Sequence, residues 1–385
     1  MLEPPSASTR AASLRHTARI LLATTFAASL WGCSMANQLS AQNIPATQKQ
    51  YQLVRSGTEG PFTLKYVDAP VRQPGANEVL VKVHAASLNR RDIFLMHGQY
   101  PIGPRKTVVP LSDGAGEVVA IGPGVSRVRV GDRVAAIFFQ TWISGSPNPS
   151  IFAGALGGQA DGMLSQYVTL NEQGLVKLPA SLSYEEGATL PCAGVTAWNG
   201  LFTRGHLQPG QYVLLEGTGG VSVFGLQFAA AVGAKPIVTS SSEEHARRAR
   251  ELGALGTVNY KTRPDWEKPV LELTQGAGVQ QVLEVGGKDS LPHALAALGM
   301  GGHLALIGGL GGFGGDIPVM KLLGTSSTVS GIYVGSRADF EAMDAFIEQH
   351  RIKPVVDRVF PFDQAPAAFE LMDKGSFFGK IVIRM

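Results

Sequence analysis

The 385-residue sequence is poor in cysteine and in charge. Its two cysteines, Cys33 and Cys192, are too few for a multi-disulfide framework or for a zinc site built from several thiolates. Charged residues make up 16% of the chain and the formal net charge is +3, so the composition gives no reason to expect nucleic-acid binding. With 44% hydrophobic residues the chain can bury a large core, which excludes a disordered protein.

The sequence also lacks a hydrophobic run that could cross a bilayer comfortably. The apolar run from Ile20 to Trp31 is too short for a spanning helix. It follows Arg10, Arg15 and Arg19, and a basic stretch before a short apolar run is typical of a secretory signal. We therefore interpret residues 1–42 as a signal-like segment and expect no integral membrane span in the mature body.

Two interpretations of this segment lead to different locations. The stretch from Leu30 to Cys33 resembles the cleavage box of a bacterial lipoprotein, which predicts an exported or lipid-anchored protein. In the alternative, translation starts at Met35 and the protein is cytoplasmic. N-terminal sequencing of the native protein distinguishes the two.

The rest of the chain changes its pattern near residue 185. Before that point it is β-rich: Glu78–His84 alternates apolar and polar residues. Beyond it, strands and helices alternate, which predicts an α/β fold with a doubly wound parallel sheet. The short strands expected in the first part, after Glu78–His84, are Glu117–Ile121, Arg127–Val130 and Arg133–Ile137.

A glycine-rich turn lies in the α/β part. The strand Tyr212–Glu216 runs into a turn and then into an apolar helix. Glycines at such a turn let backbone N–H groups approach a pyrophosphate at the positive end of the helix. The third glycine of the usual G-x-G-x-x-G pattern is Ser222 here. The predicted cofactor-binding residues of the turn are Gly217, Thr218, Gly219, Gly220 and Val221.

The end of the next strand indicates which dinucleotide is bound. An NAD site usually carries Asp or Glu there to accept from the ribose 2′-hydroxyl. This strand instead runs into Ser240, Ser241 and Ser242, with His245, Arg247 and Arg248 close behind. Small hydroxyls and a cation suit a 2′-phosphate, so we predict NADP(H) in preference to NAD(H), with Ser240, Ser241 and His245 in contact. The same serines are also good helix caps.

Several short motifs follow one another along residues 50–385. In combination they resemble the medium-chain dehydrogenase/reductase superfamily, and within it the zinc-independent quinone oxidoreductase-like or alcohol dehydrogenase-like branch. The motifs are Ala85–Asp92 (AASLNRRD), Asp113–Val119 (DGAGEVV), Gly122–Val125 (GPGV), Val130–Val134 (VGDRV), Ala188–Trp198 (ATLPCAGVTAW) and Phe378–Ile383 (FGKIVI).

The resemblance implies a GroES-like β-barrel catalytic domain (residues 49–176), a Rossmann cofactor domain (177–325) and a C-terminal return to the catalytic domain (326–385). It implies NAD(P)H-dependent hydride transfer to a quinone, enone or other activated carbonyl of a small molecule, and commonly a homodimer. Further cofactor contacts expected on this basis are Thr196, Gly286, Ile307, Val334 and Phe378.

The same resemblance bears on whether the protein binds a catalytic zinc ion. In zinc-dependent relatives three side chains hold the catalytic ion, and their positions correspond here to Asn89, Ser112 and Cys192. One thiol without a partner does not make a tetrahedral site, so we predict no zinc. The expected catalytic residues are then hydrogen-bonding groups, namely Asn89, Asp92 and Tyr100.

The sequence is compatible with three functions. The first is a zinc-independent reductase of quinones or enones. The second is a zinc-free alcohol dehydrogenase, which is disfavoured because an unactivated alcohol needs a Lewis acid or a strong base. The third is a non-catalytic NADPH-binding protein. Turnover of quinones and enones with NADPH, compared with turnover of alcohols with NADP⁺, separates them.

Overall fold

The computed structural model describes residues 44–55, 57 and 60–385. The signal-like segment predicted at 1–42 lies outside the described residues. Among the residues that are described, no helix combines the length and the apolar character that a membrane crossing requires.

In the part of the chain that the structure describes, ten strands from the N-terminal part and the C-terminal end form two sheets. The smaller is antiparallel, in the order β2-β1-β4, and the larger has the order β15-β16-β3-β5-β6-β8, with β7 also paired to β3. The strands are β1 (Thr47–Arg55), β2 (Phe62–Pro70), β3 (Glu78–Ser87), β4 (Thr107–Val108), β5 (Asp113–Ile121), β6 (Arg133–Ala136), β7 (Tyr167–Asn171), β8 (Leu175–Lys177), β15 (Val356–Pro361) and β16 (Lys380–Arg384).

The strand predicted at Arg127–Val130 is wrong, since these residues form a loop. The backbone N–H of Arg127 donates to Glu172 Oε2 (2.6 Å), and that of Arg129 donates to Asp132 Oδ2 (2.9 Å). Side-chain carboxylates therefore take the hydrogen bonds that a neighbouring strand would otherwise supply.

The predicted doubly wound sheet is confirmed. Six parallel strands lie in the order β11-β10-β9-β12-β13-β14, which places the first strand of this half, β9, beside the fourth, β12. Ligands bind at this switch point in open α/β sheets. The elements are β9 (Tyr212–Glu216), α5 (Gly220–Ala231), β10 (Lys235–Ser240), α6 (Glu243–Glu251), β11 (Gly256–Asn259), α7 (Glu267–Leu273), β12 (Val279–Glu284), α8 (Leu291–Ala297), β13 (Leu298–Leu306), α9 (Val319–Thr325) and β14 (Thr328–Gly331).

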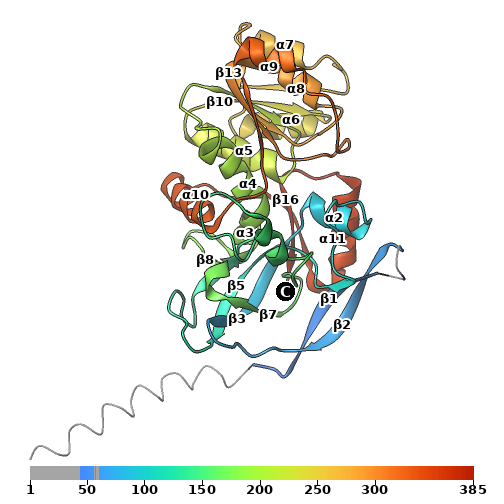
Figure 1. Ribbon diagram of the computed structural model, residues 1–385, viewed down its shortest axis with the longest axis vertical. Coiled ribbons are helices and arrows are strands. Elements are labelled where there is room, and N and C mark those ends of the chain that lie inside the picture. The colour runs from blue at the N-terminus through green and yellow to red at the C-terminus, as the bar shows by residue number, and fades with distance from the viewer. Residues whose placement is uncertain (1–43, 56, 58–59) are drawn as a thin grey trace, which may run out of the picture. The chain divides into compact units, whose positions relative to one another are not determined.

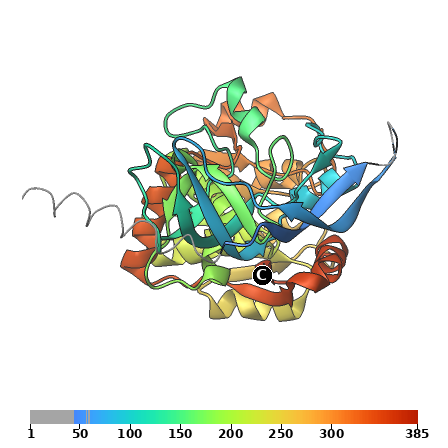
Figure 2. The same ribbon diagram turned by 90° about the horizontal axis from the view of Figure 1, so that it is seen from below.

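The remaining helices lie around and between the two parts. Helices α10 and α11 lie on opposite sides of the body, as both views show (Figures 1 and 2). One apolar cluster contains Phe139, which follows β6, and Leu215 of the parallel sheet, so the two parts share a core. The helices are α2 (Arg90–Met96), α3 (Tyr184–Gly187), α4 (Val195–Trp198), α10 (Arg337–His350) and α11 (Ala365–Lys374), with 3₁₀ segments at Pro149–Gly154, Glu172–Gly174 and Phe362–Gln364 and π-helical segments at Leu190–Gly194 and Asn199–Thr203.

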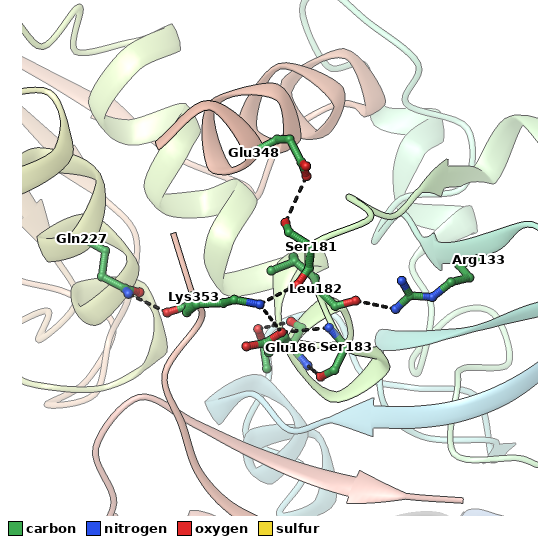
Figure 3. Close-up of polar contacts among 9 residues, drawn as sticks. Arg133, Ser181, Leu182, Ser183, Glu186, Gln227, Glu348 and Lys353 are labelled. Carbon is green, nitrogen blue, oxygen red and sulfur yellow. Dashed lines mark hydrogen bonds and ion pairs between the residues drawn. The ribbon is translucent and has the colours of Figure 1, made fainter. Parts of the chain in front are cut away.

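A polar cluster around Lys353 also joins the parts (Figure 3). Lys353 Nζ donates to Ser181 O and lies 3.3 Å from Glu186 Oε2, while the Lys353 carbonyl accepts from Gln227 Nε2 of α5 (2.7 Å). Ser181 in turn donates to Glu348 Oε2 of α10 (3.0 Å). These contacts hold the segment before α3 against the parallel-sheet part.

Asp344 of α10 is a buried carboxylate without a hydrogen-bond partner among the described residues. Burial raises its pKa well above 3.8, and Glu341 and Glu348 raise it further. The folded state therefore holds a proton that the unfolded state releases, so this group's contribution to stability falls as pH rises from about 4 through the raised pKa.

Replacing Asp344 by Asn is accordingly expected to stabilise the protein at pH 7 by about 1 kcal/mol or more, because Asn is neutral without taking up a proton and each unit of pKa difference between the folded and unfolded states corresponds to about 1.4 kcal/mol. The gain vanishes at pH values near or below 4, where Asp344 is protonated in both states. Urea unfolding at the two pH values measures this, with Glu370→Gln on the exposed face of α11 as the control. An equal stability change at both pH values would contradict the assignment.

Candidate active site

The glycine turn lies between β9 and α5, at the switch point of the sheet. Gly217 has a φ of +71°, which favours glycine. A Cβ added at Gly217 or Gly219 would meet no atom within 4 Å, so open space lies over the turn beside the N-terminus of α5. The turn therefore fits a dinucleotide pyrophosphate. Ser222, in place of the third glycine, is buried and donates to Glu216 O (2.5 Å).

The predicted 2′-phosphate residues lie together next to this turn. His245 Nδ1 is 3.0 Å from Thr218 Oγ1. Ser241 is exposed at the end of β10, and Ser240 Oγ is hydrogen-bonded to both the N–H and the carbonyl of Ser242. Ser242 is the N-cap of α6, with its Oγ accepting from His245 N (3.3 Å). Helix capping thus occupies Ser240 and Ser242, and Ser241 is left with an exposed side chain.

The two arginines of α6 that the sequence placed near the 2′-phosphate already have carboxylate partners. Arg247 pairs with Glu251 on the exposed helix surface (2.5 Å), and Arg248 pairs with Asp357 (3.1 Å) and lies over the Phe378 ring (4.2 Å). An exposed i,i+4 pair contributes only about 0.2–0.5 kcal/mol. The Arg247 side chain can therefore leave its carboxylate partner more easily than the Arg248 side chain can.

Three of the other predicted cofactor residues, Gly286, Ile307 and Val334, lie after the ends of strands, and their backbone groups already make hydrogen bonds. Gly286 N donates to Glu216 Oε2 (3.2 Å) and Ile307 N donates to Glu284 O (2.9 Å). Val334 has a φ of +50°, and its carbonyl accepts from Asn199 Nδ2 (2.8 Å). Thr196 of α4 is 3% exposed and Phe378 is fully buried.

The predicted catalytic residues Asn89 and Asp92 form the start of α2. Asp92 Oδ2 accepts from Asn89 N (2.8 Å), and Asp92 N donates to Asn89 O (3.0 Å). This reciprocal cap fixes the backbone of Asn89 at the end of β3. Burial raises the pKa of Asp92 to about 6, although the nearby Arg91 guanidinium and the Asn89 N–H oppose the shift.

Asn89 also belongs to a buried cluster around Lys380. Lys380 Nζ donates to Asn89 Oδ1 (2.6 Å) and to Leu88 O (2.6 Å), and it lies 3.6 Å from Asp113 Oδ2. Asp113 accepts from Ser112 Oγ (2.7 Å) and from Cys192 N (3.3 Å). Burial raises the pKa of Asp113, and Lys380 opposes the rise.

The side chains of this cluster do not fit a zinc ion. All three ligand positions predicted from zinc-dependent relatives, Asn89, Ser112 and Cys192, contact Lys380 or Asp113 here. Burial raises the pKa of the Cys192 thiol, and zinc binds the thiolate. An ammonium group beside the donors also repels a second cation. Nowhere in residues 44–55, 57 and 60–385 do three or more His, Cys, Asp or Glu side chains gather as a metal site.

Tyr100 lines an aromatic pocket next to Arg91. The Arg91 guanidinium lies over the Phe138 ring (4.5 Å) and the Tyr100 ring (5.8 Å), and it donates to Leu156 O (2.8 Å). Burial raises the pKa of the Tyr100 phenol, so that it keeps its proton at neutral pH. The pocket is lined by Arg91, Tyr100, Ile102, Phe138, Phe139, Phe152, Ala155, Gly158, Gln159 and Tyr333.

Sequence reasoning missed Arg91, Asp113 and Lys380 as site residues. A signal for Lys380 was available, because this charged residue opens the apolar stretch Ile381–Ile383 directly after a glycine. A lysine in a buried strand requires a partner. The position of that partner depends on how distant segments meet.

Comparisons with known proteins agree with this architecture. Residues 75–180 match the alcohol dehydrogenase GroES-like domain, and residues 220–349 match the zinc-binding dehydrogenase family. A zinc-type alcohol dehydrogenase-like protein of Schizosaccharomyces pombe is 45% identical over 80% of this chain and 91% of its own length. The chain belongs to the medium-chain dehydrogenase/reductase superfamily. The predicted superfamily and the GroES-like and Rossmann fold are thereby confirmed.

Two solved structures support the same assignment. A candidate alcohol dehydrogenase from Sinorhizobium meliloti superposes with a TM-score of 0.83, at 38% identity over 89% of this chain and all of that one. An NAD-dependent alcohol dehydrogenase superposes with a TM-score of 0.77, at 33% identity over 88% of this chain and 99% of that one. The chain is an NAD(P)-dependent oxidoreductase of the alcohol dehydrogenase-like family.

Proposed function

We propose that this oxidoreductase reduces a quinone, an enone or another activated carbonyl of a small molecule without zinc. The observation that carries the proposal is the Lys380 cluster, in which an ammonium group stands among the residues that match zinc ligands. Without a Lewis acid, the substrate carbonyl is polarised by hydrogen bonds alone, which suffice for an already electrophilic carbon.

The nicotinamide ring supplies the hydride when the dinucleotide is bound. Residues of this chain then bind the substrate and polarise its carbonyl group. Asn89 Nδ2, which has no hydrogen-bond partner among the described residues, donates to the carbonyl oxygen. The aromatic side chains that line the pocket around Arg91 would shield an apolar substrate from water. Tyr100 holds its proton and acts as a donor rather than a base, which suits the reductive direction.

The direct test compares both reaction directions. We expect NADPH to be oxidised with 1,4-benzoquinone or 2-cyclohexenone, and NADP⁺ to be reduced slowly or not at all with benzyl alcohol. Faster turnover of the alcohol would favour the zinc-free alcohol dehydrogenase. Cofactor binding without turnover of any of these compounds would favour a non-catalytic NADPH-binding protein. Metal analysis of active enzyme accompanies the test, and stoichiometric, activity-linked zinc would overturn the metal-free mechanism.

We further propose that NADP(H) is preferred to NAD(H). The support is the absence of a carboxylate at Ser240, Ser241 and Ser242, together with the nearby Arg247, whose exposed pair with Glu251 is easily released. The exposed Ser241 is the residue of this group best placed to test the preference.

Replacing Ser241 by Asp is expected to shift the ratio of kcat/KM for NADPH over NADH towards NADH by about tenfold or more. The new carboxylate repels a 2′-phosphate and accepts from a 2′-hydroxyl. Steady-state kinetics with the two cofactors measure the shift, and Ser241→Asn serves as a neutral control of similar size. If the wild-type enzyme prefers NADH, the assignment fails.

We propose that the protein forms a homodimer through an apolar face on α9 and the loop before it. Helix α9 has no buried residue, and its apolar side chains Val319, Met320 and Leu323 are 66%, 77% and 67% exposed. Leu310 and Phe313 of the preceding loop are also exposed, at 52% and 60%. Exposed apolar side chains that gather on one helix and on the loop before it are typical of a protein interface.

The double variant Met320→Lys/Leu323→Lys is expected to be monomeric where the wild type is dimeric, because two charges would be buried in the interface. Light scattering after size-exclusion chromatography gives the mass of each. Leu255→Lys, at a 51% exposed residue outside this face, is the matched control. A wild type that is monomeric at micromolar concentration would contradict the proposal.

We propose that the protein is exported or lipid-anchored through residues 1–42, on the strength of the basic and apolar stretches of this segment. A native N-terminus at residue 1 or 2 would overturn this, and one at Met35 would identify a cytoplasmic protein.

A further inference from the structure

The Lys380 side chain connects the cofactor turn with Asn89. Gly379 N, directly before it, donates to Thr218 O in the glycine turn (2.9 Å). The side chain then passes Gly220, where an added Cβ would lie only 2.7 Å from Lys380 Cδ. Its Nζ ends 2.6 Å from Asn89 Oδ1. One side chain therefore touches both the proposed dinucleotide site and the proposed catalytic amide.

We propose that Lys380 is a positioning residue that fixes the Asn89 amide with Nδ2 free to donate to the carbonyl that is reduced. This inference rests on the proposed function. An amide side chain can turn by 180° and exchange its acceptor for its donor. A lysine ammonium only donates hydrogen bonds, so the Asn89 oxygen must face Lys380 and the Asn89 nitrogen must face away from it.

The remaining contacts prevent Lys380 from moving aside. Its Nζ donates to Leu88 O and Asn89 Oδ1 (2.6 Å each) and forms an ion pair with Asp113 Oδ2 at 3.6 Å. Lys380 is 2% exposed and Asp113 is fully buried, so neither charge can reach water without its partner. Asp113 is itself held by Ser112 Oγ and Cys192 N. These contacts therefore set the position of the ammonium group, and the ammonium group sets the orientation of the Asn89 amide.

The Asn89 nitrogen ends this chain of contacts. It is buried and faces the Asp113 carboxylate, although the two make no hydrogen bond of good geometry. An amide nitrogen carries two hydrogens, and at most one of them can point to that carboxylate, so the second is the donor proposed for a ligand atom. A carbonyl oxygen of the substrate has the required acceptor chemistry.

The test uses the full chain and removes the charge pair as a unit, because Lys380→Met alone leaves Asp113 buried without its cation. In Lys380→Met/Asp113→Asn, we expect kcat for NADPH with 1,4-benzoquinone to fall by about 10- to 100-fold, the usual cost of misplacing a catalytic group. The dissociation constant for NADPH should stay within about twofold of the wild type, because the lost interaction acts on the reacting carbonyl. Lys353→Met, which removes a lysine from the polar cluster of Figure 3, is the control and should keep full turnover.

A double-mutant cycle with Asn89 separates positioning from plain stabilisation. If Lys380 acts through Asn89, then the variant that combines Asn89→Ala with the charge-pair changes has the same kcat as Asn89→Ala alone. The same cycle in urea unfolding midpoints must be non-additive, because Asn89 and Lys380 share a hydrogen bond. Wild-type kcat in the charge-pair variant, or additive unfolding midpoints, would overturn the role of Lys380. An inactive wild type would overturn the proposed function instead, and the unfolding cycle would still test the coupling.

Discussion

Replacing Asn89 by Ala is expected to lower kcat for the reduction of 1,4-benzoquinone by about 100- to 1000-fold, the usual effect of removing one preorganised donor to a developing oxyanion. The backbone at residue 89 should keep its place, because the contact with Asp92 Oδ2 is made by the backbone N–H of residue 89 and not by the Asn89 side chain. The variant should also bind NADPH with near-normal affinity, since the glycine turn is unchanged. Steady-state kinetics and a fluorescence titration with NADPH measure the two effects.

Asn89→Asp sharpens this experiment. Aspartate keeps an acceptor for Lys380 but has no donor when ionised. Both variants should therefore lose turnover if the Asn89 amide donates to substrate. Retention of wild-type kcat by the aspartate variant would show that the donor is not needed, and Asn89 would then be structural.

A second large effect is expected at Gly219. Replacing Gly219 by Val should weaken NADPH binding by about 100-fold or more, which corresponds to roughly 2.7 kcal/mol. The added side chain would occupy the open space over the turn, where the backbone has to approach the pyrophosphate. Stability should change little, because Gly219 has the extended conformation φ −77°, ψ −178° that any residue adopts.

The neighbouring glycine provides the contrast. A Cβ at Gly220 would lie 2.7 Å from Lys380 Cδ and 3.0 Å from Ala193 Cβ. Gly220→Ala should therefore lower the melting temperature as well as cofactor affinity, because those atoms are packed in the core. Isothermal titration and thermal unfolding of both variants distinguish the two kinds of glycine. Normal NADPH binding by Gly219→Val would show that the dinucleotide does not lie over this turn.

Local patterns were sufficient for much of this protein. The alternation of strands and helices after residue 185 predicts a parallel sheet, because each apolar strand needs a helix to cover it. The glycines of the 217–220 turn mark the switch point, since a backbone conformation with positive φ and an open approach are properties of a few consecutive residues. The failed strand at Arg127–Val130 shows the limit of such patterns, because its hydrogen bonds go to Glu172 and Asp132.

The tertiary structure alone decided what surrounds Asn89. Cys192 marked the third ligand position of an absent zinc site in the sequence, but only the fold shows that its N–H binds Asp113 and that Lys380 lies 3.6 Å from the same carboxylate. Asn89, Asp113, Cys192 and Lys380 come from four segments, and their meeting depends on β16 pairing with β3 next to the cofactor turn. Composition and periodicity describe neighbours along the chain, whereas a buried charge cluster is set by the packing of strands nearly 300 residues apart in sequence.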